Sequence, residues 1–421
     1  MPKKKILVLS DHALSTSGVG TQTRHLINGL LKKGEWTFRQ FGAAIKHNDY
    51  RTIVVNDDFI IKPIDGFGNK DLIRITLATE KPDLILIFTD PRFFTWLFDM
   101  EDEIHQVCPI AWWHVWDNWP KPSFNMPFYH STDLINCHSY LTYEICKQDF
   151  PEKTNFVPHA LPNDMFFPLT AEQRIEQKKA ILKDKADNFV LFWVNRNARR
   201  KRPSDLIHAW SLFRRRIEAL GKKDATLIMH TDPLDQEGPN LHEVTKLYNV
   251  QDSVVFSTDR IDFEKMNVLH NISDACINIS YAEGFGLSTL EAMQCGRPII
   301  AAKTGGLTRQ VVDHRDGTKN GIGLPIEFKT CVGSQVVPYI YEDYTSAETI
   351  ANAIEKMYNM PVAERQALGE KAQAYVKSEF SYDMVIDRWH NTLNETIKNW
   401  KSRRGKWNLV HRMIRSSLMK I

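Results

Sequence analysis

The sequence lacks a hydrophobic run long enough to cross a membrane, because no apolar stretch in its 421 residues approaches the roughly 20 that a spanning helix needs. Cysteine is also scarce, and the six cysteines do not have the spacing of a metal site or a redox pair. We therefore expect no zinc site and reduced thiols. The first apolar stretch, residues 6–9, is cut short by polar residues, which favours a buried strand over a signal peptide, and hence a cytoplasmic protein.

Acidic residues are missing from the end of the chain after Glu395, although the net charge of the whole sequence is only +3. Basic residues accumulate there: Lys398, Lys401, Arg403, Arg404, Lys406, Arg412, Arg415 and Lys420. Five apolar residues of this tail fall near helical spacing: Trp407, Val410, Ile414, Leu418 and Ile421. The tail could therefore contact nucleic acid, lie as an amphipathic helix on an anionic membrane, or pack on the rest of the protein with its charges toward solvent.

The chain is too long for one typical core, and its apolar runs indicate two α/β domains. Short apolar runs alternate with amphipathic stretches, which is typical of parallel sheets covered by helices. The alternation restarts after a charged stretch, with strands expected at 189–194, 225–229, 254–256, 275–279 and 298–301. We expect two Rossmann-like domains facing each other across a cleft, with an N-terminal domain 1–168, a C-terminal domain 169–385, and a final helix and basic tail 386–421 that cross back toward the first domain.

The stretch 280–298 carries the most informative pattern. It follows an expected strand, passes through two glycines and opens a helix, whose N-terminal N–H groups could bind a diphosphate. Glu283 would lie before this helix and Glu291 about one turn inside it, where the two acids could bind hydroxyls of a sugar and a ribose. Ser288-x-x-Glu291 also fits a helix capping box, so a purely structural interpretation stays open.

A basic stretch, 194–203, follows the first strand of the second domain. At the carboxyl end of a strand, positive side chains could neutralise a diphosphate leaving group. A solvated basic loop or a nucleic-acid patch still fits Arg199, Arg200 and Arg202.

Together these stretches resemble retaining family-four glycosyltransferases. Glu283 and Glu291 match the family's Glu-x7-Glu motif, and the likeness continues through 301–306 and 311–317. The resemblance implies a GT-B fold, retention at the anomeric carbon, and a nucleotide-sugar donor, with a UDP-sugar favoured. It implies donor contacts from Arg196, Lys201, Gly284, Phe285, Gly286, Leu287, Ser288 and Glu291, and catalytic roles for His114, Arg196, Lys201 and Glu283. No Asp-x-Asp motif is present, so no metal or other cofactor is expected.

Two N-terminal stretches extend the resemblance. Residues 17–23 follow the first strand, and Gly18 and Gly20 match the family's loop that faces donor and acceptor. Thr23 stands where a dinucleotide fingerprint needs its third glycine, which argues against an oxidoreductase. His114, at the end of another strand, falls where the family places a histidine against the donor sugar, and His159 is expected to have a positional role.

The acceptor is indicated by likeness alone. Segments 64–68, 101–106, 230–233 and 333–340 resemble transferases encoded by tailed bacteriophages, some of which glycosylate hydroxymethylated bases of phage DNA. A DNA acceptor would suit the basic tail. A lipid-linked or polysaccharide acceptor at a membrane surface is the alternative, and a non-catalytic binding protein for nucleotide sugars or nucleic acid is the alternative of another class.

Overall fold

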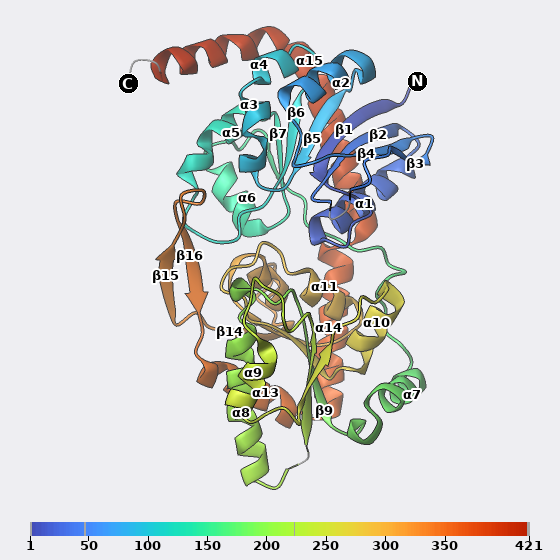
Figure 1. The fold of residues 1–421 in the computed structure, drawn as a ribbon, viewed down its shortest axis with the longest axis vertical. Coiled ribbons are helices and arrows are strands. Elements are labelled where there is room, and N and C mark those ends of the chain that lie inside the picture. Colours follow the sequence, from blue (N-terminus) through green and yellow to red (C-terminus); the bar gives the residue numbers. More distant parts are fainter. Residues whose placement is uncertain (1, 46–47, 223, 419–421) are drawn as a thin grey trace. The chain divides into compact units, whose positions relative to one another are not determined.

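The computed structural model describes residues 2–45, 48–222 and 224–418, with side chains described as far as Trp400. The chain divides into two compact units. Unit 1 contains the residues up to Trp116, Lys121–His159 and the chain from Tyr382 onward; unit 2 contains Asp117–Pro120 and Ala160–Ser381. Each unit has its own mainly parallel sheet with helices around it, which confirms the two predicted Rossmann-like domains (Figure 1).

Within the described residues, unit 1 has an eight-stranded sheet in the order β3-β4-β2-β1-β5-β6-β7-β8. Its strands are β1 (Lys4–Asp11), β2 (Trp36–Ala43), β3 (Ile53–Asn56), β4 (Phe59–Pro63), β5 (Leu84–Phe88), β6 (Ile110–His114), β7 (Leu134–Cys137) and β8 (Thr154–Phe156). All neighbours pair in parallel except β3 and β4. The strands from β5 to β7 are buried along their whole length, as expected for a sheet covered on both faces.

The helices of unit 1 are α1 (Gly18–Leu31), α2 (Lys70–Glu80), α3 (Thr95–Phe98), α4 (Glu101–Ile104), α5 (Met126–Ser131), α6 (Tyr140–Lys147) and α15 (Tyr382–Leu418), with 3-10 turns η1 (Pro91–Phe94) and η2 (Ser123–Asn125). Helix α15 joins the unit from the far end of the sequence. The Tyr382 hydroxyl donates to the backbone oxygen of His25 on α1, and the Trp389 ring packs edge-on against Trp113 of β6. The C-terminal helix is therefore part of the N-terminal unit.

In the described part of unit 2, a six-stranded parallel sheet has the order β11-β10-β9-β12-β13-β14. Its strands are β9 (Phe189–Val194), β10 (Ala225–His230), β11 (Val254–Ser257), β12 (Ala275–Asn278), β13 (Ile299–Ala302) and β14 (Gly321–Leu324). A separate antiparallel hairpin, β15 (Phe328–Val332) and β16 (Ile340–Tyr344), follows. This hairpin is not among the strands expected from the sequence.

The helices of unit 2 are α7 (Ala171–Leu182), α8 (Pro203–Ala219), α9 (Leu241–Leu247), α10 (Phe263–Ile272), α11 (Leu287–Gln294), α12 (Thr308–Val311), α13 (Ala347–Asn359) and α14 (Val362–Glu379), with 3-10 turns η3 (Lys183–Lys185), η4 (Arg199–Lys201) and η5 (Gly305–Leu307). Leu191 and Trp193 of β9 pack in one apolar cluster with Leu206 and Trp210 of α8, and all four side chains are fully buried. This packing fixes the loop that joins β9 to α8.

The strand order of unit 2 reverses at β9, whose two neighbours are β10 and β12. In open α/β sheets, ligands bind outside the carboxyl ends of the strands at such a switch point, because the flanking loops diverge there. The loops that follow β9 and β12 are those that carry Lys201 and Glu283. The fold thus brings two stretches together that are far apart in the sequence.

The unit boundaries differ from the predicted domain boundaries at Pro168 and 385. Residues from Ala160 onward lie with unit 2, because the backbone N–H groups of Phe167 and Leu169 donate to side chains of α10, at 3.1 Å to Asn267 and 2.8 Å to Asn271. The chain that links the units is thus held to unit 2 by two asparagine side chains of α10. The pattern of apolar residues in the sequence carries no sign of these hydrogen bonds.

The basic tail is described only in part. Its backbone is helical as far as Leu418, within α15. The side chains of Arg403, Arg404, Arg412, Arg415 and the apolar residues from Trp407 to Ile421 lie outside the described residues. Among the helices that the structure describes, none is both long and apolar enough to cross a bilayer.

Candidate functional site

The two loops at the switch point of unit 2 meet in a buried ion pair. The Lys201 ammonium donates to Glu283 Oε2, and the two side chains are only 13% and 10% exposed. Ser280 Oγ donates to the same carboxylate oxygen at 3.1 Å. Lys201 lies in η4, directly before α8, and Glu283 lies in the loop before α11. The structure therefore brings these two predicted site residues into direct contact.

The charges of this pair follow from their surroundings. Burial alone would raise the pKa of Glu283, but the charges of Lys201 and Arg200 and the hydrogen bonds from Lys201 and Ser280 outweigh it and lower the pKa to about 2. Burial also lowers the pKa of Lys201, while the charge of Glu283 acts in the opposite direction. Glu283 is therefore a carboxylate at neutral pH, suited to accept hydrogen bonds and not to donate a proton.

Arg200 is a member of the cluster that the sequence analysis did not select. Its Nη1 donates to the Ala282 backbone oxygen at 2.9 Å and lies 3.7 Å from both Glu283 Oε2 and Asp117 Oδ2. Its side chain is 44% exposed, so one face remains open to solvent. Two cations and two carboxylates thus converge where we expected only Lys201 and Glu283. We call Asp117, Arg200, Lys201 and Glu283 the charged cluster.

The interpretation as a solvated basic loop still fits Arg199 and Arg200, whose side chains are 66% and 44% exposed, but it is wrong for Arg202. Arg202 is 5% exposed, donates to Asp205 and to the Thr345 backbone oxygen, and lies over the Tyr281 ring. Arg199 donates to Glu342 of β16. These cations have carboxylate or backbone partners because the loop folds back over unit 2.

Arg196 lies apart from the charged cluster. Its guanidinium donates twice to Asp235 of the β10–α9 loop, at 2.7 and 3.0 Å, and the side chain is 60% exposed. No ion pair or hydrogen bond between described side chains joins it to Lys201 or Glu283. Its role at the diphosphate stays a prediction.

The helix that follows Glu283 begins differently from a capping box. Helix α11 starts at Leu287, its N-cap is Gly286 with φ +93°, and Ser288 lies inside the first turn. Gln310 Nε2 donates to the backbone oxygens of Phe285 and Gly286 at 2.7 and 3.0 Å, which fixes the loop. The N-cap is therefore Gly286, in the left-handed backbone conformation, and not Ser288. The capping-box interpretation of Ser288-x-x-Glu291 is wrong. The N–H groups of 287–288 belong to the unbonded first turn.

Glu291 is held by a histidine that the sequence analysis did not identify. Its Oε2 lies 3.1 Å from Nε2 of His270 on α10, whose Nδ1 lies 3.4 Å from Cys276 Sγ on β12. The His270 ring is fully buried, whereas the Glu291 side chain is 17% exposed. His270 is therefore placed to orient the Glu291 carboxylate.

A short segment from the first half of the chain belongs to unit 2. Within Asp117–Pro120, Asn118 Nδ2 donates to the Tyr341 backbone oxygen at 3.1 Å, and Trp119 O accepts from Tyr341 N at 2.7 Å. The segment is thus bonded to β16 of the hairpin. It comes shortly after β6 in sequence, and it carries Asp117 of the charged cluster.

The predicted glycines Gly18 and Gly20 lie at the start of α1 in unit 1. Ser17 caps this helix, accepting from Gly20 N at 3.0 Å and donating to Asp11 Oδ2 at 2.6 Å. A Cβ at Gly20 would lie 2.5 Å from the His12 backbone oxygen, so only glycine fits. The close contact is with the protein's own backbone, and the approach of Gly18 and Gly20 to donor or acceptor stays a prediction.

His114 and His159 are both buried in unit 1. His114 Nε2 lies 2.8 Å from the Tyr129 hydroxyl, and its ring lies 3.9 Å from that of Trp112, with no exposed surface. His159 stacks on His138 at 4.1 Å, and burial together with the charge of His25 lowers its pKa to about 3. His159 is therefore neutral at physiological pH. The packing of His114 is typical of a structural histidine, and its contact with a donor sugar stays a prediction.

Part of the chain matches a model of a known protein family, and the matched region includes both Lys201 and Glu283. Residues 173–322 match the family model of glycosyl transferases group 1. A D-inositol 3-phosphate glycosyltransferase of Salinispora tropica is 33% identical over 135 residues, 31% of this chain and 27% of the relative. That of an Arthrobacter species is 29% identical over 204 residues, 48% of this chain and 44% of the relative. The matches thus span less than half the length of these relatives.

Solved structures match over nearly the whole chain. Sucrose-phosphate synthase from Thermosynechococcus elongatus aligns with a TM-score of 0.73 at 18% identity, covering 94% of this chain and 100% of that one. Anabaena Alr3699/HepE in complex with UDP and glucose aligns with a TM-score of 0.67 at 17% identity, covering 93% and 100%. At this identity the likeness shows the fold, which is GT-B.

Proposed function

We propose that this chain is a retaining glycosyltransferase that moves a sugar from a nucleoside-diphosphate sugar to an acceptor hydroxyl. The observation that carries the proposal is the charged cluster at the switch point of unit 2, beside the N-terminus of α11. The group 1 glycosyl transferase model covers the loops of Lys201 and Glu283, and the curated relatives bear glycosyltransferase names. A cytoplasmic location remains part of the proposal.

The reaction breaks the bond between the anomeric carbon and the departing phosphate oxygen and forms one to the acceptor oxygen. The acceptor proton passes to the departing phosphate, so that a nucleoside diphosphate leaves. Lys201, Arg200 and the first-turn N–H groups of α11 would stabilise the growing negative charge. Glu283 would accept hydrogen bonds from the transferred sugar. Neither Glu283 nor Glu291 acts as a nucleophile in this scheme.

A UDP-sugar is the donor that we propose first, because the similar Anabaena structure contains UDP and glucose. The 421 residues contain no Asp-x-Asp motif to hold a metal against the diphosphate. We therefore propose that the chain's own cations neutralise it and that no metal or cofactor is required.

The donor assignment is tested by thermal unfolding with a panel of nucleotide sugars. A ligand at one hundred times its dissociation constant stabilises the folded state by about 2.7 kcal/mol, so the correct donor should raise the melting temperature clearly. Release of nucleoside diphosphate should then require an acceptor. A donor that binds but is never turned over with any acceptor would favour the non-catalytic alternative.

The contact between His270 and Glu291 predicts a graded loss of nucleotide affinity. We expect Glu291→Ala to weaken nucleoside diphosphate binding by about tenfold or more, the scale of a hydrogen bond to a charged group. His270→Phe should weaken it less, because it leaves the carboxylate present but unoriented. Titration calorimetry measures both affinities. Glu283→Ala, the contrasting variant, should impair sugar transfer more than diphosphate binding.

If Glu291 has only a structural role, its loss would lower the melting temperature and leave nucleotide affinity intact. Glu291→Gln separates the two cases, because it keeps an oxygen facing His270 and should retain part of the affinity. Equal affinity in all of these folded variants would refute a ribose contact.

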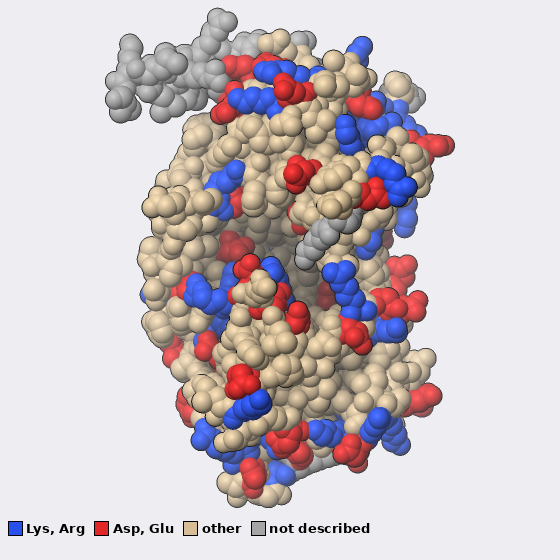
Figure 2. Space-filling model, viewed as in Figure 1, with Lys and Arg blue, Asp and Glu red and all other residues tan. Residues whose placement is uncertain are grey.

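We propose a hydroxymethylated base of phage DNA as the acceptor. The proposal rests on the phage-like segments and on the acid-free chain from Lys398 onward. On the face shown in Figure 2, Lys and Arg are interspersed with Asp and Glu, so that face offers no continuous basic surface among the described residues. In this proposal the basic tail contacts the DNA. The alternative is a lipid-linked acceptor, with the tail on a membrane.

The two acceptors differ in their response to salt and to charge removal. Duplex DNA should bind weakly, without sequence preference, and more weakly as salt rises; neutralising Arg403, Arg404, Arg412 and Arg415 should flatten this dependence and raise KM for DNA. Donor binding should not change. Capture by anionic vesicles, with release by Ile414→Glu or Leu418→Glu and no labelling of hydroxymethylated DNA, would establish the lipid alternative instead.

A further inference from the structure

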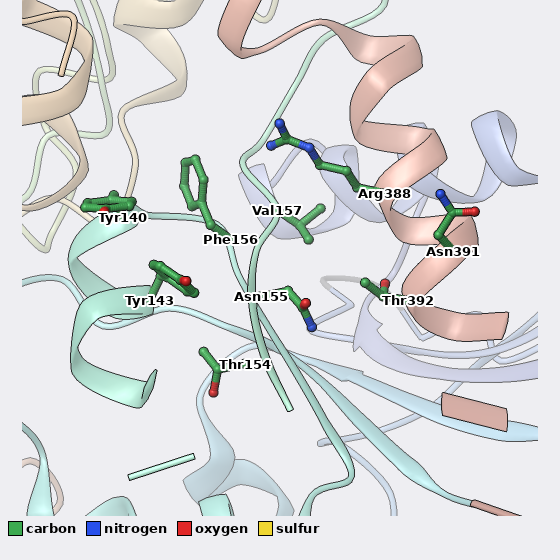
Figure 3. Close-up of a pocket in the computed structure, with 9 residues that line it drawn as sticks. All are labelled: Tyr140, Tyr143, Thr154, Asn155, Phe156, Val157, Arg388, Asn391 and Thr392. Atoms are coloured by element: carbon green, nitrogen blue, oxygen red, sulfur yellow. The ribbon is translucent and has the colours of Figure 1, made fainter. Parts of the chain in front are cut away.

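Unit 1 contains a groove that shares no residue with the charged cluster. It has a volume of about 490 Å³ and is lined from three elements: Tyr140 and Tyr143 of α6, Asn155 and Phe156 of β8, and Arg388 and Asn391 of α15. Figure 3 shows the three aromatic rings on one side and the α15 residues on the other. Because all of these elements belong to unit 1, the groove is a property of that unit.

The aromatic side offers ring surface to a ligand. The rings of Tyr140 and Tyr143 both lie near that of Phe156, with centroid distances of 5.5 and 6.3 Å. The three side chains are only half-buried. Apolar C–H faces of a sugar ring pack well on such partly exposed rings. The Lys147 ammonium lies 4.6 Å from the Tyr143 ring centroid and adds positive charge to this side.

The α15 side offers hydrogen-bonding groups. Among the described side chains, no carboxylate lies within 4 Å of the Arg388 guanidinium, which donates only to Met384 Sδ at 3.6 Å. The side-chain amides of Asn155 and Asn391 likewise have no hydrogen-bond partner within the described ranges. None of the nine lining residues is acidic. The groove therefore combines a cation and two amides with an aromatic wall.

We propose that this groove binds an acidic saccharide. The sugar ring would lie against Tyr143 and Phe156, its carboxylate or phosphate group would bind the Arg388 guanidinium, and its hydroxyls would pair with the two amides. Each amide offers both donors and an acceptor, which matches neighbouring sugar hydroxyls. A guanidinium binds a planar anion with two parallel hydrogen bonds.

The ring geometry favours a saccharide over single-stranded nucleic acid. Proteins that bind single-stranded nucleic acid stack successive bases on aromatic side chains along a continuous basic groove. Here the Tyr140 and Phe156 rings are perpendicular and those of Tyr143 and Phe156 are tilted by 48°, so they do not form a row of parallel platforms for successive bases. The site is independent of the transferase proposal, because no group that we assign to the donor lines it.

The test uses the full chain with excess UDP present, so that a nucleotide site is filled. Saturation-transfer NMR compares methyl glucuronide, glucose 6-phosphate and methyl glucoside. We expect both acidic probes to bind more tightly than methyl glucoside. Arg388→Gln should weaken the acidic probes by about tenfold and remove the preference, the scale of a charge-assisted hydrogen bond. Tyr143→Ala should weaken all three, and Arg260→Gln, an exposed arginine of unit 2, should change none.

The comparison between the two acidic probes identifies which anion the site prefers. The proposal fails if none of the three probes binds at millimolar concentration, or if binding survives both Arg388→Gln and Tyr143→Ala. It also fails if an oligothymidylate displaces the probes and binds more tightly than they do, since the groove would then be a nucleic-acid site. Saccharide binding in a chain that turns over no nucleotide sugar would contradict only the transferase proposal.

Discussion

Replacing Lys201 with alanine is expected to lower turnover of the nucleotide sugar by about 10²-fold or more. This is the scale for removing a preorganised group that stabilises charge in the transition state. The Lys201 ammonium is buried against Glu283 at the switch point of unit 2. Water that entered after its removal would not supply an equivalent fixed positive charge. Steady-state kinetics with the donor identified by thermal unfolding provide the measurement.

Two controls distinguish a chemical role from a structural one. Lys201→Ala leaves Glu283 buried without its nearest cation, and breaking a buried pair commonly costs about 3–5 kcal/mol of stability, so the melting temperature must be recorded with the kinetics. Lys246→Ala removes a lysine from an exposed pair with Glu243 and should leave turnover unchanged. A folded Lys201→Ala protein with near-normal turnover would remove Lys201 from the mechanism.

Gly305→Ala is expected to destabilise unit 2 by about 3 kcal/mol or more, through backbone strain and overpacking together. Gly305 has φ +46°, and a Cβ there would lie 2.1 Å from the Glu283 backbone oxygen and 2.4 Å from that of Asp117. Neither backbone atom can move without displacing the charged cluster. Donor affinity should therefore fall together with the midpoint of urea unfolding.

Gly317→Ala is the matched control for this substitution. Gly317 also has a positive φ, +74°, but among the described residues no heavy atom lies within 4 Å of the position that a methyl group would occupy there. Its substitution should cost only the backbone strain, about 1–2 kcal/mol, and leave donor binding intact. Equal losses of stability in the two variants would show that close packing around Gly305 contributes nothing.

The strands and the switch-point loops could be predicted because they depend on local patterns. Apolar runs locate β9 and β12, and the loops that follow them must lie at one edge of a parallel sheet. These patterns locate the two loops, and the resemblance to family-four glycosyltransferases then selected Lys201 and Glu283 within them. The capping-box interpretation failed because the local Ser–Glu spacing says nothing about φ at Gly286, which decides where α11 begins.

The remaining members of the site depend on contacts between distant residues. Arg200 has the same local pattern as Arg199, and only the folded loop directs one toward Glu283 and the other toward Glu342. Asp117 enters unit 2 through hydrogen bonds of its neighbours with β16. In the sequence, His270 cannot be distinguished from a histidine of the core. Its contacts with Cys276 of β12 and Glu291 of α11 form only in the folded protein. Single-sequence patterns carry no signal for such pairings.

The division of the chain has a consequence for its synthesis. The polypeptide passes between the units at 116/117, 120/121, 159/160 and 381/382, so unit 1 is completed only by α15. While a ribosome is still making unit 2, the surfaces of Gly29 and Trp113 that α15 later covers stand open to solvent. All of unit 2 is synthesised before α15, so unit 2 can complete its fold before unit 1 does. The first-translated unit is thus the last to mature, and a chain arrested before Tyr382 would expose an apolar face prone to aggregation.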